Sequence, residues 1–291
     1  MKPNYAFPTF QQFLPTEKRP LKRLRSFLRF YLYSFLCKHE IKEFENYINT
    51  HRQWDSLFVK IPYRCDALLR KFCDKRFNKV KRLNAIIDNL NIANVKFSKI
   101  QQDLVKQESL PLVKLTDNLT AYLNINQIDP FEGFFSINIK DEENGLSIYD
   151  ASFTFLAPNK LLIASIQGTK ENNSQQLIRS STKALHGIRP MFMLVNLFKI
   201  MSNTLNCELL GIAHKNQAKY RFNDNKKLLF NYDEFWQENG AILDKQGYWV
   251  IPLNIERKAL EDIQSKKRSM YRKRYAMLDD AETQILKFFK E

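Results

Sequence analysis

The stretch LLIASIQGTKENNSQQLIRSSTKALHGIRPMFMLVNLFKIMSNTLNCELLGIAHKNQAKYR, residues 161–221, decides the fold of this chain. The apolar run at 161–166 predicts a strand, a helical pattern begins at Ser174, and a second apolar run at 209–213 predicts another strand. Polar residues gather where these elements end, and ligands of α/β proteins bind at such ends. The stretch therefore predicts a strand–helix–strand unit that carries the functional site.

The helical part of this unit is interrupted near His186, Gly187 and Pro190. Glycine often ends a helix, and proline often begins one because it has no amide hydrogen to donate. Two consecutive helices are predicted, and a single kinked helix is the alternative. In both arrangements His186 and Arg189 lie at a discontinuity where backbone groups are partly free.

Alternating polar and apolar residues precede the unit. The pattern at 134–140 and the Asn144-Gly145 pair predict a hairpin. With runs at 112–115, 146–156 and 161–166, they predict a meander of about four strands over 112–167. A last strand is predicted at 248–252, followed by a charged helix from Ile255.

The remaining N-terminal part of the chain has helical periodicity and many basic residues. The predicted fold class is therefore α+β with an α/β-like core. We predict a basic helical region at 1–110 and an α/β domain with a C-terminal basic helix at 111–291. The two parts are expected to form one continuous unit or two tightly packed layers.

The composition excludes some classes of function but does not identify one. The net charge of +15 attracts nucleic acid, anionic lipid or acidic small molecules, and a basic surface without a dedicated site is equally compatible with it. The 7 glycines argue against glycine-rich phosphate loops. No secretory signal or apolar run of membrane-spanning length is evident, so we expect a cytoplasmic protein.

The cysteines and histidines give no metal-binding pattern. Four of each are present, without a CxxC pair or an HxxxH spacing. We therefore expect no metal site and free buried thiols.

Residues 21–36 predict a helix with both apolar and basic faces. Leu21, Leu24, Leu28, Tyr31 and Phe35 recur at three- and four-residue steps, with basic residues between them. Packing onto the protein's own core is the favoured interpretation. Peripheral contact with an anionic inner membrane and contact with nucleic acid are the alternatives.

Several motifs resemble one known family. Residues 183–190 read KALHGIRP, 232–240 read YDEFWQENG, 129–133 read DPFEG and 152–155 read SFTF. Together they resemble the VirK/YbjX family of Gram-negative bacteria over roughly residues 60–280. The chain departs from that family's pattern at Phe134, where a second acidic residue is common, and at 87–90, where a His-Tyr pair is common.

The resemblance implies a biological setting and no established active site. It implies a cytoplasmic bacterial protein linked to virulence, cell-envelope integrity and resistance to cationic antimicrobial peptides. One branch of the family is linked to stress and DNA-damage responses. The family is described mostly as a domain of unknown function.

The order of predicted elements is also similar to the core of GNAT-type acyltransferases. In that fold, amides of a loop and a helix start hold a pantetheine pyrophosphate, because N–H groups and the helix dipole attract anions. The corresponding loop here is 167–174, although the usual glycine-rich signature is missing. The sequence itself does not identify a cofactor; a GNAT-type core implies acyl-CoA or another acyl donor, and the 161–166 and 209–213 strands must diverge to admit a pantetheine arm.

Polar residues at the strand ends and at the helix break are the candidate site residues. Glu132, His186 and His214 are candidate catalytic acids or bases. The candidate substrate- or cofactor-binding residues are Gln167, Gly168, Lys170, Arg189, Lys215, Asn216, Tyr220 and Arg221. Structural roles are the alternative for each histidine and for Arg189, whose planar guanidinium can bind phosphate or carboxylate.

Three functional hypotheses follow. The first is acyl or aminoacyl transfer to an envelope precursor or another anionic small molecule, in a cleft formed by Glu132, His186, Arg189, His214 and Asn216. The second is a non-enzymatic cationic protein that binds nucleic acid or anionic membrane in a stress response, nucleic acid being the less favoured partner. The third is a scaffold for an envelope-assembly partner.

Overall fold

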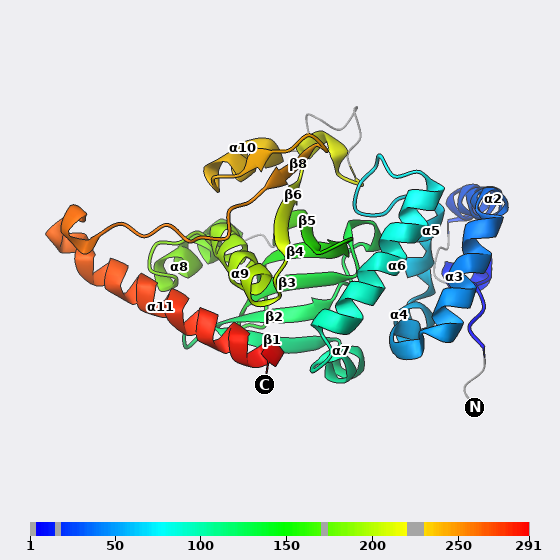
Figure 1. Cartoon of the computed structure of the whole chain (residues 1–291). Helices are drawn as coiled ribbons and strands as arrows, with labels where there is room; N and C mark the ends of the chain where they lie inside the picture. The colour runs from blue at the N-terminus through cyan, green and yellow to red at the C-terminus, as the bar shows by residue number, and fades with distance from the viewer. Residues whose placement is uncertain (1–3, 15–18, 170–173, 220–229, 291) are drawn as a thin grey trace.

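Short helices make up the N-terminal third of the chain in the computed structural model, which describes residues 4–14, 19–169, 174–219 and 230–290 (Figure 1). They begin with a capping box, in which the Thr9 side chain accepts from the Gln12 amide and the Gln12 side chain accepts from the Thr9 amide. The helices are α1 (Phe10–Phe13), α2 (Pro20–Leu36), α3 (Lys38–Thr50), α4 (Asp55–Lys60), α5 (Asp66–Leu69), α6 (Lys79–Lys96) and α7 (Gln101–Gln107).

An eight-stranded mixed sheet follows, with the strand order β1-β2-β3-β4-β5-β6-β8-β7. All neighbouring strands are antiparallel except β5 and β6, which are parallel. The strands are β1 (Ser109–Lys114), β2 (Leu119–Ile125), β3 (Phe135–Asp141), β4 (Ser147–Leu156), β5 (Lys160–Gly168), β6 (Glu208–Ile212), β7 (Ile242–Leu243) and β8 (Tyr248–Val250). This arrangement confirms the predicted α+β class.

The meander has five strands where about four were predicted. The additional strand is β2, in which Leu119, Ala121 and Leu123 are buried and alternate with Thr120, Tyr122 and Asn124. Such alternation is the ordinary signal of a strand with two different faces. The four predicted runs correspond to β1, β3, β4 and β5.

Two helices, α8 (Ser174–Ala184) and α9 (Pro190–Thr204), connect β5 to β6. The kinked single helix is therefore wrong, and the predicted pair is confirmed. His186 and Gly187 lie between them with positive φ angles of 51° and 83°. This left-handed backbone turns the chain, after which Pro190 begins α9. The remaining helices are α10 (Tyr232–Glu238) and α11 (Ser265–Lys290).

One hydrophobic core joins the N-terminal helices to the sheet. Phe135 of β3 packs edge-on against Trp54 and against Phe97, with ring centroids 5.4 and 5.2 Å away. On the same face, Phe153 of β4 packs against Phe198 of α9 at 5.5 Å. The buried residues on both sides of position 110 belong to one contact cluster, and position 110 itself lies inside β1.

Helix α2 contacts the rest of the protein along only one face. Phe30 is its only buried residue, and it packs on Phe10 and Phe13 of α1. The stripe that includes Leu21 and Phe35 is exposed, with 82% and 77% of these residues accessible. The interpretation that this stripe packs on the protein's own core is therefore wrong, because the small cluster around α1 occupies the opposite face.

Membrane-spanning helices were also sought. Over the described residues, none of the helices combines the length and the apolar character that a bilayer crossing requires.

Candidate functional site

Glu132 is held at the entry of β3 by a tight turn. Asp129 accepts a hydrogen bond from the Phe131 amide, and the short helix η3 (Pro130–Glu132) follows. Gly133 then adopts φ 114°, and a Cβ there would lie 2.3 Å from the Phe153 carbonyl oxygen. Only glycine fits both conditions, so the DPFEG sequence fixes the position of the Glu132 side chain against β4 and β5.

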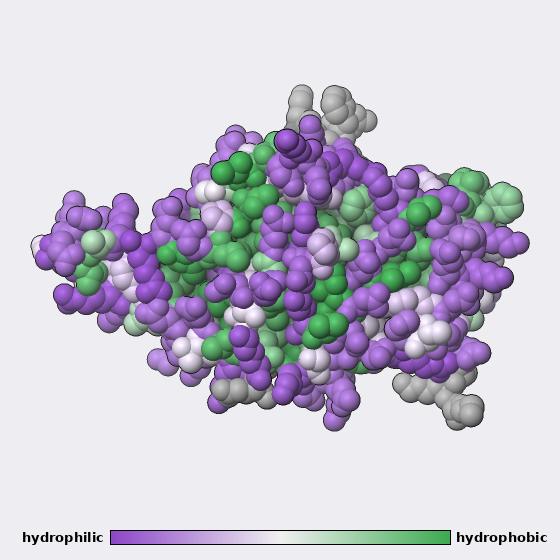
Figure 2. All heavy atoms as spheres, viewed as in Figure 1, coloured by the Kyte–Doolittle hydropathy of each residue, from purple (hydrophilic) through white to green (hydrophobic). Residues whose placement is uncertain are grey.

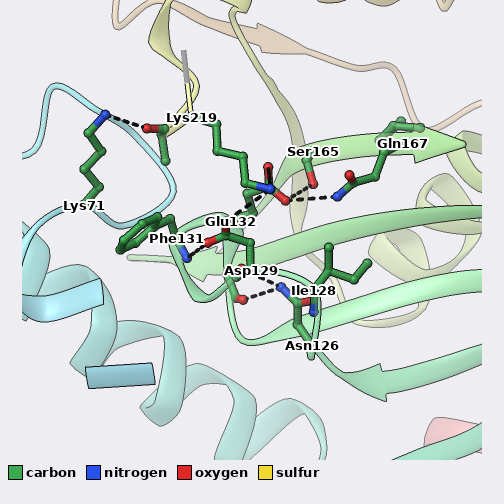
Figure 3. A network of polar contacts seen from close by, with 12 residues as sticks. Lys71, Asn126, Ile128, Asp129, Phe131, Glu132, Ser165, Gln167 and Lys219 are labelled. Carbon is green, nitrogen blue, oxygen red and sulfur yellow. Dashed lines mark hydrogen bonds and ion pairs between the residues drawn. The ribbon is translucent and has the colours of Figure 1, made fainter. Parts of the chain in front are cut away.

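The Glu132 carboxylate is the centre of a polar network (Figure 3). Ser165 Oγ donates to its Oε2 at 2.9 Å, and Gln167 Nε2 donates to the same oxygen at 3.2 Å. Lys219 Nζ lies 3.3 Å from Oε1 and 3.2 Å from Asp129 Oδ2. The network thus joins the β3 entry, the end of β5 and the segment after β6, all distant in sequence.

Burial decides the protonation chemistry of this carboxyl. Only 6% of Glu132 is accessible, and this burial raises the pKa of its carboxyl, although Lys219 and Ser165 oppose the shift. A carboxyl whose pKa is raised by burial holds a proton more readily than a free carboxyl does, which favours proton transfer in both directions. Glu132 is therefore suited to general acid–base work.

The sheet carries two polar rows beside Glu132. Across β2–β5 the first row is Asn124, Ser136, Ser152 and Ser165, and the second is Tyr122, Asn138, Asp150 and Gln167. Residues two apart on a strand share a face, so both rows lie on the side opposite Phe135 and Phe153. Ser152 Oγ is buried and has no hydrogen-bond partner among the described residues.

A cavity of about 590 Å³ lies next to the network and is rich in cations. Asp129 and Lys219, which both contact Glu132, form part of its wall. Lys71 also lines it and donates to the Ala218 carbonyl at 2.9 Å, which ties the segment after β6 to the N-terminal helices. The lining residues are Arg29, Tyr33, Tyr63, Arg70, Lys71, Asp129, Phe131, Ala218 and Lys219. This composition suits an anionic ligand with an apolar portion.

Strands β5 and β6 separate close to Glu132. They pair from Lys160 with Glu208 to Ile163 with Gly211, while β5 continues to Gly168. Beyond the paired part, the Tyr232 hydroxyl donates to the Ile166 carbonyl at 2.8 Å and accepts from the Ile166 amide at 2.9 Å. Pairing between the two strands thus ends at Ile163 and Gly211, and beyond that point the Tyr232 side chain occupies the unpaired backbone edge of β5.

The YDEFW segment holds this gap in place. Trp236 Nε1 donates to the Ile212 carbonyl at 2.8 Å, and a Cβ on Gly211 would lie 2.5 Å from the Trp236 ring. Asp233 Oδ1 accepts from the His214 amide at 2.9 Å and from Trp249 Nε1 at 2.8 Å. The motif is therefore a structural wedge between β5 and β6.

The predicted residues after β6 form a second group, beside this wedge. His214 Nδ1 accepts from the Tyr232 amide at 3.4 Å. Asn216 is buried, and its carbonyl accepts from the Lys75 amide at 2.9 Å, whereas Lys215 is exposed. These contacts give His214 and Asn216 positioning roles in the fold and bring His214 near the wedge.

His186 and Arg189 form a third group, near α11. The His186 carbonyl accepts two hydrogen bonds from the Arg274 guanidinium, at 3.0 and 2.8 Å. Burial, with Lys273 and Arg274 nearby, lowers the pKa of the His186 imidazole. Burial raises the pKa of the Tyr149 phenol, and the nearby charge of the exposed Arg189 opposes this shift. The ALHGIRP sequence thus forms a socket for Arg274.

Gly168 is a further candidate at the end of β5. Gly168 packs against the Tyr149 ring, where a Cβ would approach to 3.1 Å. Lys170, Tyr220 and Arg221 lie outside the described residues. The contacts place the predicted residues in three groups, and the single cleft expected from Glu132, His186, Arg189, His214 and Asn216 stays a prediction.

The sequence analysis missed several residues of the Glu132 network. Ser165 and Lys219 carry no motif of their own, and Asp129 belongs to the DPFEG motif but was not chosen as a site residue. For Ser165 the available signal was the alternation of polar residues along β5, which places Ser165 and Gln167 on one face of the sheet. Metal ligands are a separate matter: no group of three or more His, Cys, Asp or Glu side chains suited to a metal occurs within the described part of the chain.

The comparisons with known proteins give a family. A family model described as "Protein of unknown function (DUF535)" matches residues 19–287. An uncharacterized protein of Haemophilus influenzae is 53% identical over 281 residues, which are 96% of this chain and 96% of that protein. No solved structure matches the chain.

Two further relatives are more distant. A protein of Mannheimia haemolytica named membrane protein LapB is 30% identical over 220 residues, which are 75% of this chain and 96% of that protein. The uncharacterized protein YbjX of Escherichia coli is 29% identical over 195 residues, which are 64% of this chain and 57% of that protein.

Proposed function

Because the chain belongs to the DUF535 family of proteins of unknown function, we propose its function from the Glu132 site: transfer of an acyl or aminoacyl group to an anionic component of the cell envelope. The resemblance to YbjX, drawn from the sequence motifs, is confirmed by the matches to YbjX and LapB. The name of the Mannheimia relative, membrane protein LapB, is consistent with a role at a membrane.

One observation carries the proposal. Glu132 is a buried carboxyl of raised pKa that contacts Ser165 and Gln167 at the end of β5, beside the point where β5 leaves β6. An antiparallel meander, a helical crossover and a parallel strand that diverges are features of the GNAT-type acyltransferase core. The combination of a base with a divergent strand pair supports group transfer more than binding alone.

The chemistry assigned to Glu132 is proton transfer. The acceptor oxygen or nitrogen forms a bond to the acyl carbon while the Glu132 carboxylate takes the acceptor proton. The bond from the acyl carbon to the donor's oxygen or sulfur breaks, and the proton passes from Glu132 to that leaving group. Lys219 can stabilise the carboxylate form at the start, since it lies 3.3 Å away.

Tyr232 restricts the donor. Its hydroxyl occupies the backbone groups of Ile166 that a pantetheine arm would use on β5. An acyl-CoA donor would have to displace this side chain, whereas an aminoacyl donor on another carrier needs no pairing with β5. The proposal therefore covers acyl and aminoacyl donors and does not depend on coenzyme A.

The test uses cells that lack the gene and carry a copy of the wild type, Glu132→Gln or Glu142→Gln. Glu142 is an exposed carboxyl on the β3–β4 turn, so its variant controls for loss of charge. Mass spectrometry of envelope lipids and precursors should reveal an acylated or aminoacylated species that the wild type and Glu142→Gln restore. Glu132→Gln should lower that species at least about tenfold at equal protein level.

The outcome that overturns the proposal also favours the second candidate. If Glu132→Gln restores the envelope composition and the resistance of the cells to cationic antimicrobial peptides as fully as the wild type does, Glu132 takes no part in catalysis. A non-enzymatic cationic membrane protein then explains the function better, because α2 exposes a row of apolar side chains beside basic ones.

A further inference from the structure

Helix α2 places its apolar side chains in water. Its only buried residue is Phe30. The exposed large apolar residues have between 41% and 82% of their surface accessible. They are Leu21, Leu24, Phe27, Leu28, Tyr31, Leu32, Phe35 and Leu36.

Most of these residues form a face directed away from the protein, and Phe27 at its edge also contacts the Phe10 ring, with the ring centroids 5.3 Å apart. The side chains share one side of the helix, because steps of three, four and seven residues separate Leu21, Leu24, Leu28 and Phe35. Phe30 lies on the other side, against α1. The amphipathic pattern is therefore inverted relative to a helix that packs on its own protein.

The position of α2 makes this face accessible to a flat surface. Figure 1 shows α2 at one edge of the molecule, with α11 at the far edge, and in Figure 2 hydrophobic side chains gather at the place of α2. Leu24, Phe27 and Tyr31 border a cavity of about 710 Å³ that α2 forms with Phe10 of α1. Beside this cavity, Leu28, Leu32 and Phe35 remain exposed. A ridge of leucine and phenylalanine fits a lipid headgroup layer, into which such faces sink by about 5–10 Å.

Charge selects the kind of lipid. The residues Lys22, Arg23, Arg25 and Arg29 are all exposed on α2, and the whole chain has a net charge of +15. Juxtaposed basic and apolar side chains favour an anionic bilayer, because each cation near such a surface adds binding energy that a neutral bilayer does not supply.

We infer that α2 docks the protein onto an anionic phospholipid bilayer, lying in the headgroup layer with the Leu21–Phe35 face toward the acyl chains. This inference does not depend on the transfer activity proposed above. Where both hold, they specify the acceptor class as an anionic lipid. Arg29 and Tyr33 of α2 line the cationic cavity whose other wall includes Asp129 and Lys219, so the docked helix sets that cavity beside the lipid headgroups.

The experiment measures co-sedimentation of the full chain with vesicles of phosphatidylcholine containing phosphatidylglycerol, and with vesicles of phosphatidylcholine alone. The test variant is Leu28→Gln with Phe35→Gln. The matched control is Ile242→Gln with Leu243→Gln, because these residues of β7 are also apolar and exposed, at 75% and 51%. Circular dichroism and urea midpoints confirm that both variants fold.

The wild type and the control should both bind the anionic vesicles. The α2 variant should bind these vesicles at least about tenfold more weakly than the wild type, and the wild type should bind neutral vesicles at least about tenfold more weakly than anionic ones. Equal binding of the α2 variant and the wild type would overturn the inference, as would a lack of wild-type binding. Sedimentation velocity without vesicles tests a second copy as the occupant. A wild-type dimer that becomes monomeric in the α2 variant would also overturn the inference. A failure here leaves the Glu132→Gln test of group transfer unaffected.

Discussion

The Tyr232 hydroxyl offers the sharpest test of the structure, because a single oxygen atom completes the edge of β5. It bonds both the amide and the carbonyl of Ile166, a residue that is 4% accessible. Burial raises the pKa of the Tyr232 hydroxyl, so it stays protonated and can donate throughout the neutral range. Tyr232→Phe removes this atom and leaves the ring in place.

The expected loss of stability follows from the Ile166 amide and carbonyl, which lose their hydrogen-bond partner in this variant. A buried backbone group that loses its hydrogen bond costs about 1–3 kcal/mol. Since the two groups share one site, we expect Tyr232→Phe to lower the free energy of unfolding by about 2–4 kcal/mol. Urea denaturation followed by tryptophan fluorescence measures this directly, and the Trp236 ring lies 6.1 Å from the Tyr232 ring.

The matched control is Tyr122→Phe. The Tyr122 hydroxyl donates to Glu142 at 2.8 Å at an exposed position, where water can replace the carboxylate. This variant should change the free energy of unfolding by less than about 0.5 kcal/mol. If Tyr232→Phe costs no more than the control, the hydroxyl does not satisfy the edge of β5, and the account of the gap between β5 and β6 is wrong.

Two further variants test other parts of the structure. Gly187→Ala introduces a Cβ at φ 83° that would lie 2.8 Å from Arg274 Nη2, whereas Gly145→Ala introduces one at φ 69° with nothing within 4 Å. Urea denaturation should show that Gly145→Ala lowers the free energy of unfolding by about 1 kcal/mol and that Gly187→Ala lowers it further. Equal losses would contradict the close contact between Gly187 and Arg274. Burial raises the pKa of the Asp150 carboxyl in the folded chain, so its charged form costs stability as the pH rises above the carboxyl's usual pKa. Asp150→Asn should therefore raise the urea midpoint at about pH 7 and leave it nearly unchanged at about pH 3, and an equal effect at both would refute this assignment.

The sequence predicts the elements of this fold better than their contacts. The parallel pair β5 and β6 and the two helices between them follow from apolar runs and from the Gly187–Pro190 break. Strand β2 was missed because its alternation runs through Thr120, Tyr122 and Asn124, whose burial depends on neighbouring strands. Pattern alone reports which residues share a face and does not report what covers it.

The candidate site divides in the same way. Glu132 and Gln167 were identified as polar residues at strand ends, and they meet in the structure at 3.2 Å. Lys219 could not be selected from the sequence, since its contact with Glu132 depends on how the segment after β6 turns back toward η3. The outward face of α2 was also misjudged, because helical periodicity gives the same signal whether a stripe faces a core or a membrane.

The shared core has a consequence for how the protein is made. Phe97, directly after α6, stacks on Phe289 in the last turn of α11, with ring centroids 5.7 Å apart, and Gln284 of α11 bonds the backbone of Lys114 in β1. The N-terminal helices therefore find part of their packing only in α11, which is synthesised after them and after the sheet. Folding of this chain can be completed only after α11 has left the ribosome, so a nascent chain that ends at the sheet still exposes core aromatic rings to chaperones.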